Sequence, residues 1–118
     1  MVIYKYEEWS VNERVVELTE ANWDREVAQC PLPVLVDFSG AYCAPCRMLE
    51  PTVEALASDF AGQVKVGKVT CEENQELATR FGVRSVPHLV LLRGGQPVAV
   101  VQGRTRTRIA DEIEGHLA

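Results

Sequence analysis

The segment from Val34 to Phe38 constrains the fold more than any other part of the chain. It is a continuous apolar run, interrupted only by Asp37, and does not alternate with polar residues. A strand of this kind is buried on both faces, as strands are in the middle of a parallel sheet. Apolar residues then recur at steps of four, three and four, which predicts an amphipathic helix from about Cys43 to Ala61. A buried strand followed by a helix favours an α/β fold.

The other segments extend this pattern to the order β-α-β-α-β-α-β-β-α. Besides these two elements, we expect strands near 15–18, 64–69, 89–92 and 98–101, and helices near 19–28, 74–81 and 109–117. The last two strands flank Gly94-Gly95-Gln96-Pro97 and predict an antiparallel hairpin, whereas the earlier crossovers require parallel strands. Residues 1–13 have no clear period, so we expect an N-terminal arm followed by one domain at 14–118.

The composition limits where the chain works and what it binds. The formal net charge of −5 argues against a nucleic-acid binder, which would carry a basic face. No run approaches the roughly 18 apolar residues that cross a bilayer, and the first residues do not resemble a signal peptide. We therefore expect a cytoplasmic protein. Because that compartment keeps thiols reduced, the 4 cysteines do not predict a disulfide framework.

The segment Cys43-Ala44-Pro45-Cys46 carries the clearest chemistry. Two thiols at this spacing can switch between a dithiol and a disulfide, and near a strand-then-helix pattern they indicate a redox motif. The alternative is a structural zinc site, which would need two further ligands. The remaining candidates, Cys30, Cys71, His88 and His116, form no matching second pair, so we expect no metal and no other cofactor.

Several motifs together resemble the thioredoxin family. They are Val36-Asp37-Phe38, Cys43-x-Pro45-Cys46 with Pro51 five residues on, Phe81-Gly82-Val83-Arg84-Ser85-Val86-Pro87, Gly94-Gly95 and Gly103. The resemblance covers roughly residues 18–117 and implies a thioredoxin fold, a central mixed five-stranded sheet flanked by four helices. It also implies thiol–disulfide exchange on protein substrates, with Cys43 as the nucleophile and Cys46 as the resolving thiol. Asp37 matches a buried acid near Lys68, and Pro87 matches a cis-proline that faces the dithiol.

The expected position of Cys43 favours a thiolate. Open α/β sheets react at the carboxyl ends of their strands, and Cys43 lies just past such an end, at the start of a helix. Unpaired backbone N–H groups and the helix dipole favour an anion there, so we expect a pKa below the free-cysteine value of about 8.5. The thiolate would form a mixed disulfide with a substrate, which Cys46 then resolves. Pro45 restricts the backbone between the sulfurs, and the neighbouring Arg47 adds a cation.

Asp37 lies among apolar residues, where a lone carboxylate is costly and its pKa should rise. One hypothesis is that Asp37 accepts the proton of Cys46 through water during exchange. The other is that Asp37 forms a structural ion pair with Lys68. The residues alone do not separate the two, and the resemblance favours the first.

The surface around the dithiol is the expected substrate site. A cis Val86–Pro87 bond would leave the Val86 backbone free to pair with an extended substrate segment. We expect further substrate contacts from Tyr42, Ala44, Pro45, Gly103 and Cys71. The expected partners are proteins with accessible disulfides and an electron donor of the thioredoxin reductase type, and the chain should be a monomer. We expect no nucleic-acid or membrane partner.

Five positions depart from the usual thioredoxin pattern: Ser39, Tyr42, Ala44, Arg47 and His88. These changes leave the reaction class intact but do not fix the reduction potential. A disulfide isomerase or oxidant with a less reducing potential is therefore an alternative. A non-catalytic partner subunit with the same fold is another.

Two residues near the motif have two interpretations each. His88, next to Pro87, either makes exchange sensitive to pH near neutrality or is a partly exposed strand histidine. Cys71 is either a third redox thiol or a small buried hydrophobe. Cys30 precedes the second strand, at the opposite edge of the sheet, so it should not bond to Cys71.

A cluster of arginines, Arg104, Arg106 and Arg108, precedes the last predicted helix. Such a run is usually a solvated face. With Arg47 and Arg84 it could instead form a basic patch for an acidic partner protein, and the sequence does not decide between the two.

Overall fold

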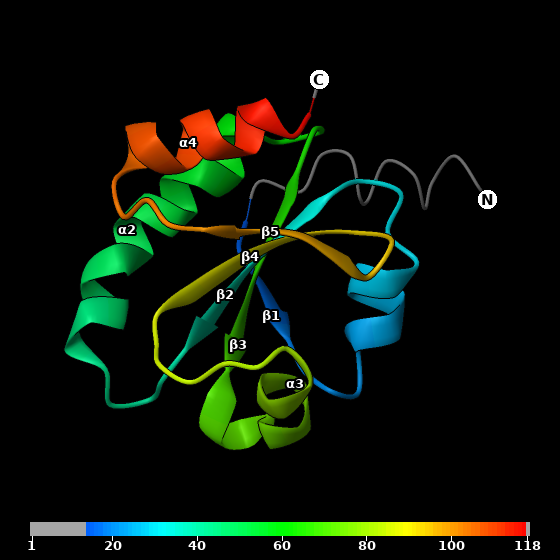
Figure 1. The fold of residues 1–118 in the computed structure, drawn as a ribbon, viewed down its shortest axis with the longest axis vertical. Coiled ribbons are helices and arrows are strands. Elements are labelled where there is room, and N and C mark those ends of the chain that lie inside the picture. The colour runs from blue at the N-terminus through cyan, green and yellow to red at the C-terminus, as the bar shows by residue number, and fades with distance from the viewer. Residues whose placement is uncertain (1–13, 118) are drawn as a thin grey trace.

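The sheet has five strands in the order β1-β3-β2-β4-β5, and helices cover both of its faces (Figure 1). The computed structural model describes residues 14–117, so the predicted N-terminal arm at 1–13 lies outside the described residues. The strands are β1 (Val16–Leu18), β2 (Val34–Ser39), β3 (Lys65–Thr70), β4 (His88–Arg93) and β5 (Gln96–Val101). The mixed five-stranded sheet expected from the sequence is confirmed.

Strand β2 is the centre of the sheet, and all six of its residues are buried. It pairs in parallel with β3 and antiparallel with β4, while β1 lies parallel to β3 and β5 antiparallel to β4. The predicted central strand and C-terminal hairpin are therefore confirmed. The register places Asp37 between Lys68 on β3 and Leu89 on β4.

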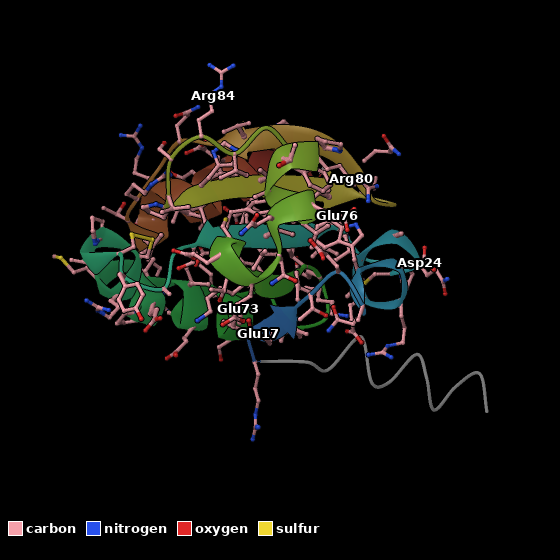
Figure 2. The ribbon with its side chains drawn as sticks, turned by 90° about the horizontal axis from the view of Figure 1, so that it is seen from below. Glu17, Asp24, Glu73, Glu76, Arg80 and Arg84 are labelled. Carbon is pink, nitrogen blue, oxygen red and sulfur yellow. A yellow bond between two sulfur atoms is a disulfide. The ribbon has the colours of Figure 1, made fainter. Side chains whose placement is uncertain are left out.

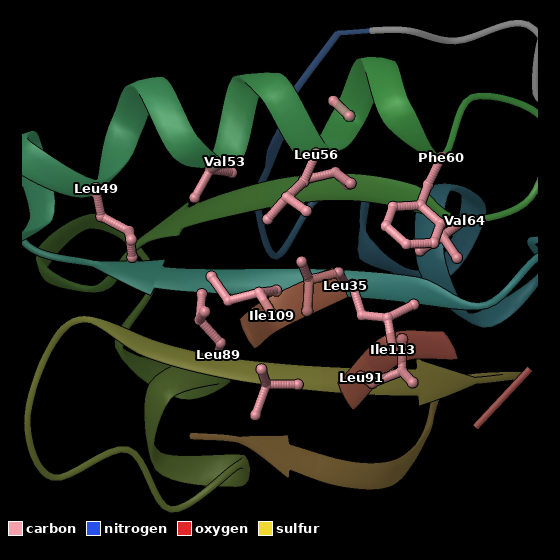
Figure 3. Close-up of a cluster of buried hydrophobic side chains, with 13 residues drawn as sticks. Leu35, Leu49, Val53, Leu56, Phe60, Val64, Leu89, Leu91, Ile109 and Ile113 are labelled. Atoms are coloured by element: carbon pink, nitrogen blue, oxygen red, sulfur yellow. The ribbon is translucent and has the colours of Figure 1, made fainter. Parts of the chain in front are cut away.

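One face of the sheet is covered by α2 (Ala44–Asp59) and α4 (Arg106–Gly115). The apolar side chains of both helices and of the sheet form the core in Figure 3. Its buried residues are Leu35, Leu49, Val53, Leu56, Ala57, Phe60, Val64, Val66, Leu89, Leu91, Val101, Ile109 and Ile113. The steps of four and three along α2 therefore point into this core, as the sequence predicts.

The opposite face is covered by η1 (Asp24–Ala28) and α3 (Gln75–Arg80), with the short η2 (Cys71–Glu73) leading into α3. Phe81 joins this second core: its ring lies 5.2 Å from that of Trp23 and 5.7 Å from that of Phe38. Aromatic pairs at such distances stabilise a core beyond the area that they bury.

The first predicted helix, near 19–28, is shorter than expected. Thr19 and Asn22 exchange hydrogen bonds: the Thr19 N–H donates to Asn22 Oδ1 at 2.8 Å and the Asn22 N–H to Thr19 Oγ1 at 3.2 Å. These bonds form a turn, so the helical part is reduced to η1, a π-helical segment in which the Gln29 N–H donates to the Asp24 carbonyl. Side chains of threonine and asparagine compete with the backbone in this way.

The other helix predictions agree with the structure to within a few residues. Helix α2 begins directly after Cys43 and accommodates Pro45 in its first turn, where a proline lacks no helical hydrogen bond. Helix α4 begins at Arg106, earlier than its apolar residues indicate, because Thr105 caps it: Thr105 Oγ1 accepts the Arg108 N–H at 3.2 Å.

Candidate active site

Cys43 and Cys46 form a disulfide at the N-terminus of α2, so the structure shows the oxidised state of the pair (Figure 2). Their Cα atoms are 5.2 Å apart. Cys43 caps the helix and its Sγ accepts the Cys46 N–H at 3.1 Å. Cys43 is half-buried, whereas Cys46 is 1% exposed. Only the first sulfur is therefore open to an incoming molecule, and it lies where a helix N-terminus stabilises negative charge.

The loop before β4 lies against this disulfide. The Val86–Pro87 peptide bond is cis, as the resemblance implies. The Sγ of Cys43 lies 3.9 Å from the Val86 carbonyl oxygen. The backbone of Val86 is thus next to the more accessible sulfur.

Asp37 is buried at 1% exposure in the centre of β2, and its Oδ1 has no hydrogen-bond partner in the described part of the chain. Burial raises the pKa of this carboxyl from its ordinary 3.8 to about 6; nearby Lys68 and Arg104 oppose the rise, and Glu50 adds to it. Within residues 14–117, the carboxylate that pairs with Lys68 is Glu50, with 3.6 Å between Nζ and Oε2. The hypothesis of a structural Asp37–Lys68 ion pair therefore finds no support in these contacts.

A solvent-open cavity of about 200 Å³ lies beside Asp37. It is lined by Val15, Glu17, Asp37, Glu50, Val53, Glu54 and Lys68. The cavity is polar and large enough for water, which needs polar partners in such a site. It runs along α2, since Glu50 lies about one helical turn beyond Cys46. Water in it could carry a proton between Asp37 and the surface.

A groove of about 360 Å³ lies on the other side of the first turn of α2. It is lined by Pro45, Met48, Leu49, Pro87 and Arg104. Met48 is 80% exposed although it is apolar, and Tyr42, just before the disulfide, is 94% exposed. Both side chains are therefore open to contact with other molecules near the disulfide.

The structure gives the remaining predicted site residues different places. Ala44 and Arg47 are exposed on the first turns of α2. Gly103 is buried, and its N–H donates to Glu112 Oε2 at 2.6 Å. A Cβ at position 103 would lie 2.8 Å from the Cβ of Arg108, so this glycine allows a close approach between the loop and α4.

Cys71 and His88 lie against the second core. Cys71 is half-buried and unpaired, and burial raises the pKa of its thiol, with Glu72 and Asp37 adding to the rise. Cys30, which the sequence places too far from Cys71 to bond to it, is also unpaired. The His88 ring lies 6.1 Å from that of Phe38, and burial lowers its pKa, as does Arg104. These surroundings favour the interpretation of His88 as a partly exposed strand histidine.

Three charged residues next to the site were not predicted as part of it. Glu50 pairs with Lys68, and the Oε1 of Glu72 accepts the Ala41 N–H at 3.1 Å. Arg104 donates to the Pro87 carbonyl at 3.2 Å. The sequence held a signal for two of them: Glu50 lies one helical turn after Cys46, and Arg104 directly follows Gly103.

Two kinds of feature are absent from the described residues. Across residues 14–117 there is no group of three or more His, Cys, Asp or Glu side chains that could hold a metal ion. Over the same residues, no helix is both long and apolar enough to cross a membrane.

Comparison with known proteins gives consistent matches. The family profile described as thioredoxin matches residues 14–115. Thioredoxin 1 of Nostoc sp. is 39% identical over 86% of this chain and 95% of that protein, and thioredoxin 1 of Synechococcus elongatus is 41% identical over 85% and 94%. The thioredoxin of Haemophilus influenzae is 38% identical over 87% and 97%. The chloroplastic thioredoxin M-type of Zea mays is 36% identical over 87% of this chain and 64% of that protein.

Proposed function

The chain belongs to the thioredoxin family and is a dithiol protein-disulfide oxidoreductase, and we propose how its residues divide the reaction. In the proposal Cys43 attacks the substrate disulfide and Cys46 resolves the mixed disulfide. The observation that carries it is the difference between the two sulfurs. Cys46 is 1% exposed, whereas Cys43 is half-buried, caps α2 and has the Val86 carbonyl beside it.

The reaction begins with the reduced dithiol. The Cys43 thiolate bonds to one substrate sulfur, and the other substrate sulfur leaves as a thiolate and takes up a proton. Cys46 then loses its proton and attacks the Cys43 sulfur, which expels the second substrate sulfur as a thiolate. Two electrons have passed to the substrate, and the protein is left with the Cys43–Cys46 disulfide that the structure contains.

We propose Asp37 as the acceptor of the Cys46 proton, through water in the cavity along α2. A base works best when its pKa is near the working pH, and burial brings the pKa of Asp37 to about 6. Its Oδ1 has no partner among residues 14–117 that would hold it in another role. Lys68 and Glu50, which pair with each other, both line this cavity.

The substrate surface in this proposal is the backbone of Val86 together with the exposed residues around the disulfide. An extended substrate segment would pair with Val86 as an added strand, with its cysteine over Cys43. Tyr42, Ala44 and Pro45 are all exposed and supply contacts on the side of α2. Gly103 and Cys71 are proposed to border the same surface.

The electron donor and the location are also part of the proposal. Return to the dithiol requires two electrons from outside the chain, and a thioredoxin reductase-type enzyme is the class of protein that supplies them. A reducing compartment such as the cytoplasm suits a protein whose working form is the dithiol. We propose that the chain acts as a monomer.

The test is reduction of insulin disulfides with dithiothreitol as electron source. Cys43→Ser should abolish the catalysed rate, and Cys46→Ser should stop after one step and accumulate a mixed disulfide visible by mass spectrometry. Cys30→Ala is the matched control and should retain the rate, because Cys30 is outside the disulfide and outside the proposed substrate surface. A Cys43→Ser protein that still catalyses insulin reduction would refute the assignment.

A redox titration of the Cys43–Cys46 pair in glutathione buffers decides between a reductase and the alternatives. A midpoint near about −270 mV is expected for a reductase of thioredoxin type. A midpoint near about −180 mV or above would favour isomerase or oxidant chemistry instead. A variant lacking both cysteines that still supports all cellular functions of the chain would favour the non-catalytic partner subunit.

A further inference from the structure

The groove beside the disulfide has an apolar lining with one charged residue. Among the described residues, its walls are formed by Pro45, Met48, Leu49 and Pro87, and Arg104 is the one that carries a charge. The groove borders both the first turn of α2 and the cis-proline loop, so a substrate segment whose cysteine lies over Cys43 would pass along it.

Arg104 is held in place by backbone carbonyls. Its Nη1 donates to the Val101 oxygen at 3.0 Å and to the Gly103 oxygen at 2.7 Å, and its Nη2 donates to the Pro87 oxygen at 3.2 Å. A guanidinium has five N–H donors, so these bonds leave the Nε–H and one Nη2–H for another acceptor. Because the side chain is already ordered, binding of a carboxylate would cost little further side-chain conformational entropy.

Of the described carboxylates near Arg104 or the disulfide, Glu112 and Glu72 accept backbone N–H groups, and Asp37 is close enough for Arg104 to oppose the rise of its pKa but does not bond to it. Glu112 accepts the N–H groups of Gln102 at 2.9 Å and Gly103 at 2.6 Å. Glu72, on the side of the loop before the disulfide, accepts the Ala41 N–H at 3.1 Å. None of these three carboxylates bonds to Arg104 in the described contacts, so its two remaining N–H donors have no carboxylate partner among residues 14–117.

Figure 2 labels four carboxylates, Glu17 on β1, Asp24 on η1, Glu73 at the end of η2 and Glu76 on α3, and draws the disulfide apart from them. The chain carries a net charge of −5, so a strongly acidic partner would be repelled at long range. The local charge at the groove is positive, and it suits a single carboxylate rather than an acidic surface.

We infer that Arg104 is a specificity-determining residue that favours protein disulfides with an aspartate or glutamate beside the attacked cysteine, in an otherwise apolar segment. The inference rests on the proposed function of the Cys43–Cys46 pair. The apolar part of the segment covers Met48, Pro45 and Pro87, and the carboxylate accepts the free N–H groups of Arg104. Charge-assisted hydrogen bonds from arginine to a carboxylate are among the stronger polar contacts, and the apolar walls exclude part of the water that would weaken them.

The test uses two peptides that each contain one disulfide and differ only by Glu or Gln next to the attacked cysteine. The wild-type protein should reduce the Glu peptide with a kcat/KM roughly two- to fivefold higher, the range expected for one partly exposed ion pair. Arg104→Gln should remove that preference and Arg104→Lys should keep part of it. Arg106→Gln is the matched control and should leave the preference unchanged, since Arg106 pairs with Asp59 outside the groove.

The ratio of the two rates separates recognition from a structural role. If Arg104 merely supports the Pro87 loop, Arg104→Gln lowers both rates equally and the Glu preference of the variant persists, which overturns the inference. Equal wild-type rates on both peptides overturn it as well. A wild-type protein that reduces neither peptide nor insulin would instead overturn the proposed function, and the inference with it.

Discussion

Replacing the buried Asp37 by asparagine should make the oxidised protein more stable at pH 8 and change its stability little at pH 4. The folded protein raises the pKa of this carboxyl from 3.8 to about 6, mainly through burial. The unfolded chain therefore ionises Asp37 more easily, and the folded state is penalised as the pH rises from about 4 to about 6. Above that window the penalty is complete and constant. An asparagine side chain at this position would carry no charge in either state and would avoid the penalty.

The pKa values give the size of the effect. A rise from 3.8 to about 6, at about 1.4 kcal/mol for each pH unit, corresponds to about 3 kcal/mol at pH 8. At pH 4 the same pKa values give a penalty on the folded state of only about half a kcal/mol. Asparagine keeps the shape of the protonated acid, and its amide can bond to water in the cavity of about 200 Å³ beside it.

Urea unfolding of the oxidised wild-type and Asp37→Asn proteins at pH 4 and pH 8 measures both differences. Asp59→Asn is the control, because the pKa of Asp59 is shifted in the opposite direction: hydrogen bonds from Arg106 lower it. Removing the Asp59 carboxylate should therefore not stabilise the protein at pH 8. The same Asp37→Asn protein should reduce insulin more slowly at pH 7. A variant that is equally stabilised at both pH values, or destabilised at pH 8, would refute the reasoning.

Two further pairs of substitutions test charges that the fold brings together. Glu50→Gln should lower the pKa of Asp37, because it removes a charge that raises that pKa and frees Lys68. Glu54→Gln, in the same cavity, is the control and should lower the pKa less. Carboxyl NMR titration measures both shifts, and equal shifts would contradict the special role of Glu50. Glu26→Gln should destabilise the protein by about 3 kcal/mol, because it leaves the 1% exposed Lys65 without its carboxylate. Lys65→Met should lower the free energy of unfolding, measured in urea, by less than Glu26→Gln does. A larger loss in Lys65→Met would contradict this explanation.

The parts of the fold that were predictable are those set by local patterns. The continuous run from Val34 to Phe38 predicted the central strand, and the steps of four and three after Cys43 predicted α2. The turn at Gly94 and Gly95, both with positive φ, gave the hairpin. In each case the residues that determine the structure are neighbours in the sequence.

The parts that were not predictable depend on side chains that meet from distant segments. Lys65 is charged, yet it is buried because its Nζ reaches the carbonyl and the carboxylate of Glu26, 39 residues earlier. The first helix is shorter than its apolar spacing predicts, because Thr19 and Asn22 hydrogen-bond to each other's backbone. No period in the sequence reports such contacts.

The same distinction applies to the candidate site. The disulfide pair, the buried acid and the cis-proline follow from motifs, and the structure brings these segments to one edge of the sheet. The partner of Lys68 does not follow from them. The resemblance placed Lys68 near Asp37, and the register does set the two opposite each other, but the ammonium group turns to Glu50 at 3.6 Å. Strand register fixes backbones, whereas a long lysine side chain selects among the carboxylates within its reach.

In the proposed exchange reaction, the penalty on Asp37 follows from the asymmetry of the two sulfurs. Cys46 is 1% exposed, so a proton that leaves it must pass through the protein rather than directly into bulk water. A base for that proton has to be buried as well, and burial is what raises the pKa of Asp37 to about 6. The cavity along α2 then connects the buried carboxyl to solvent. A more exposed acid would stabilise the fold at neutral pH, but its pKa would be too low to hold the proton, so under the proposed role stability and exchange set opposite demands on this one residue.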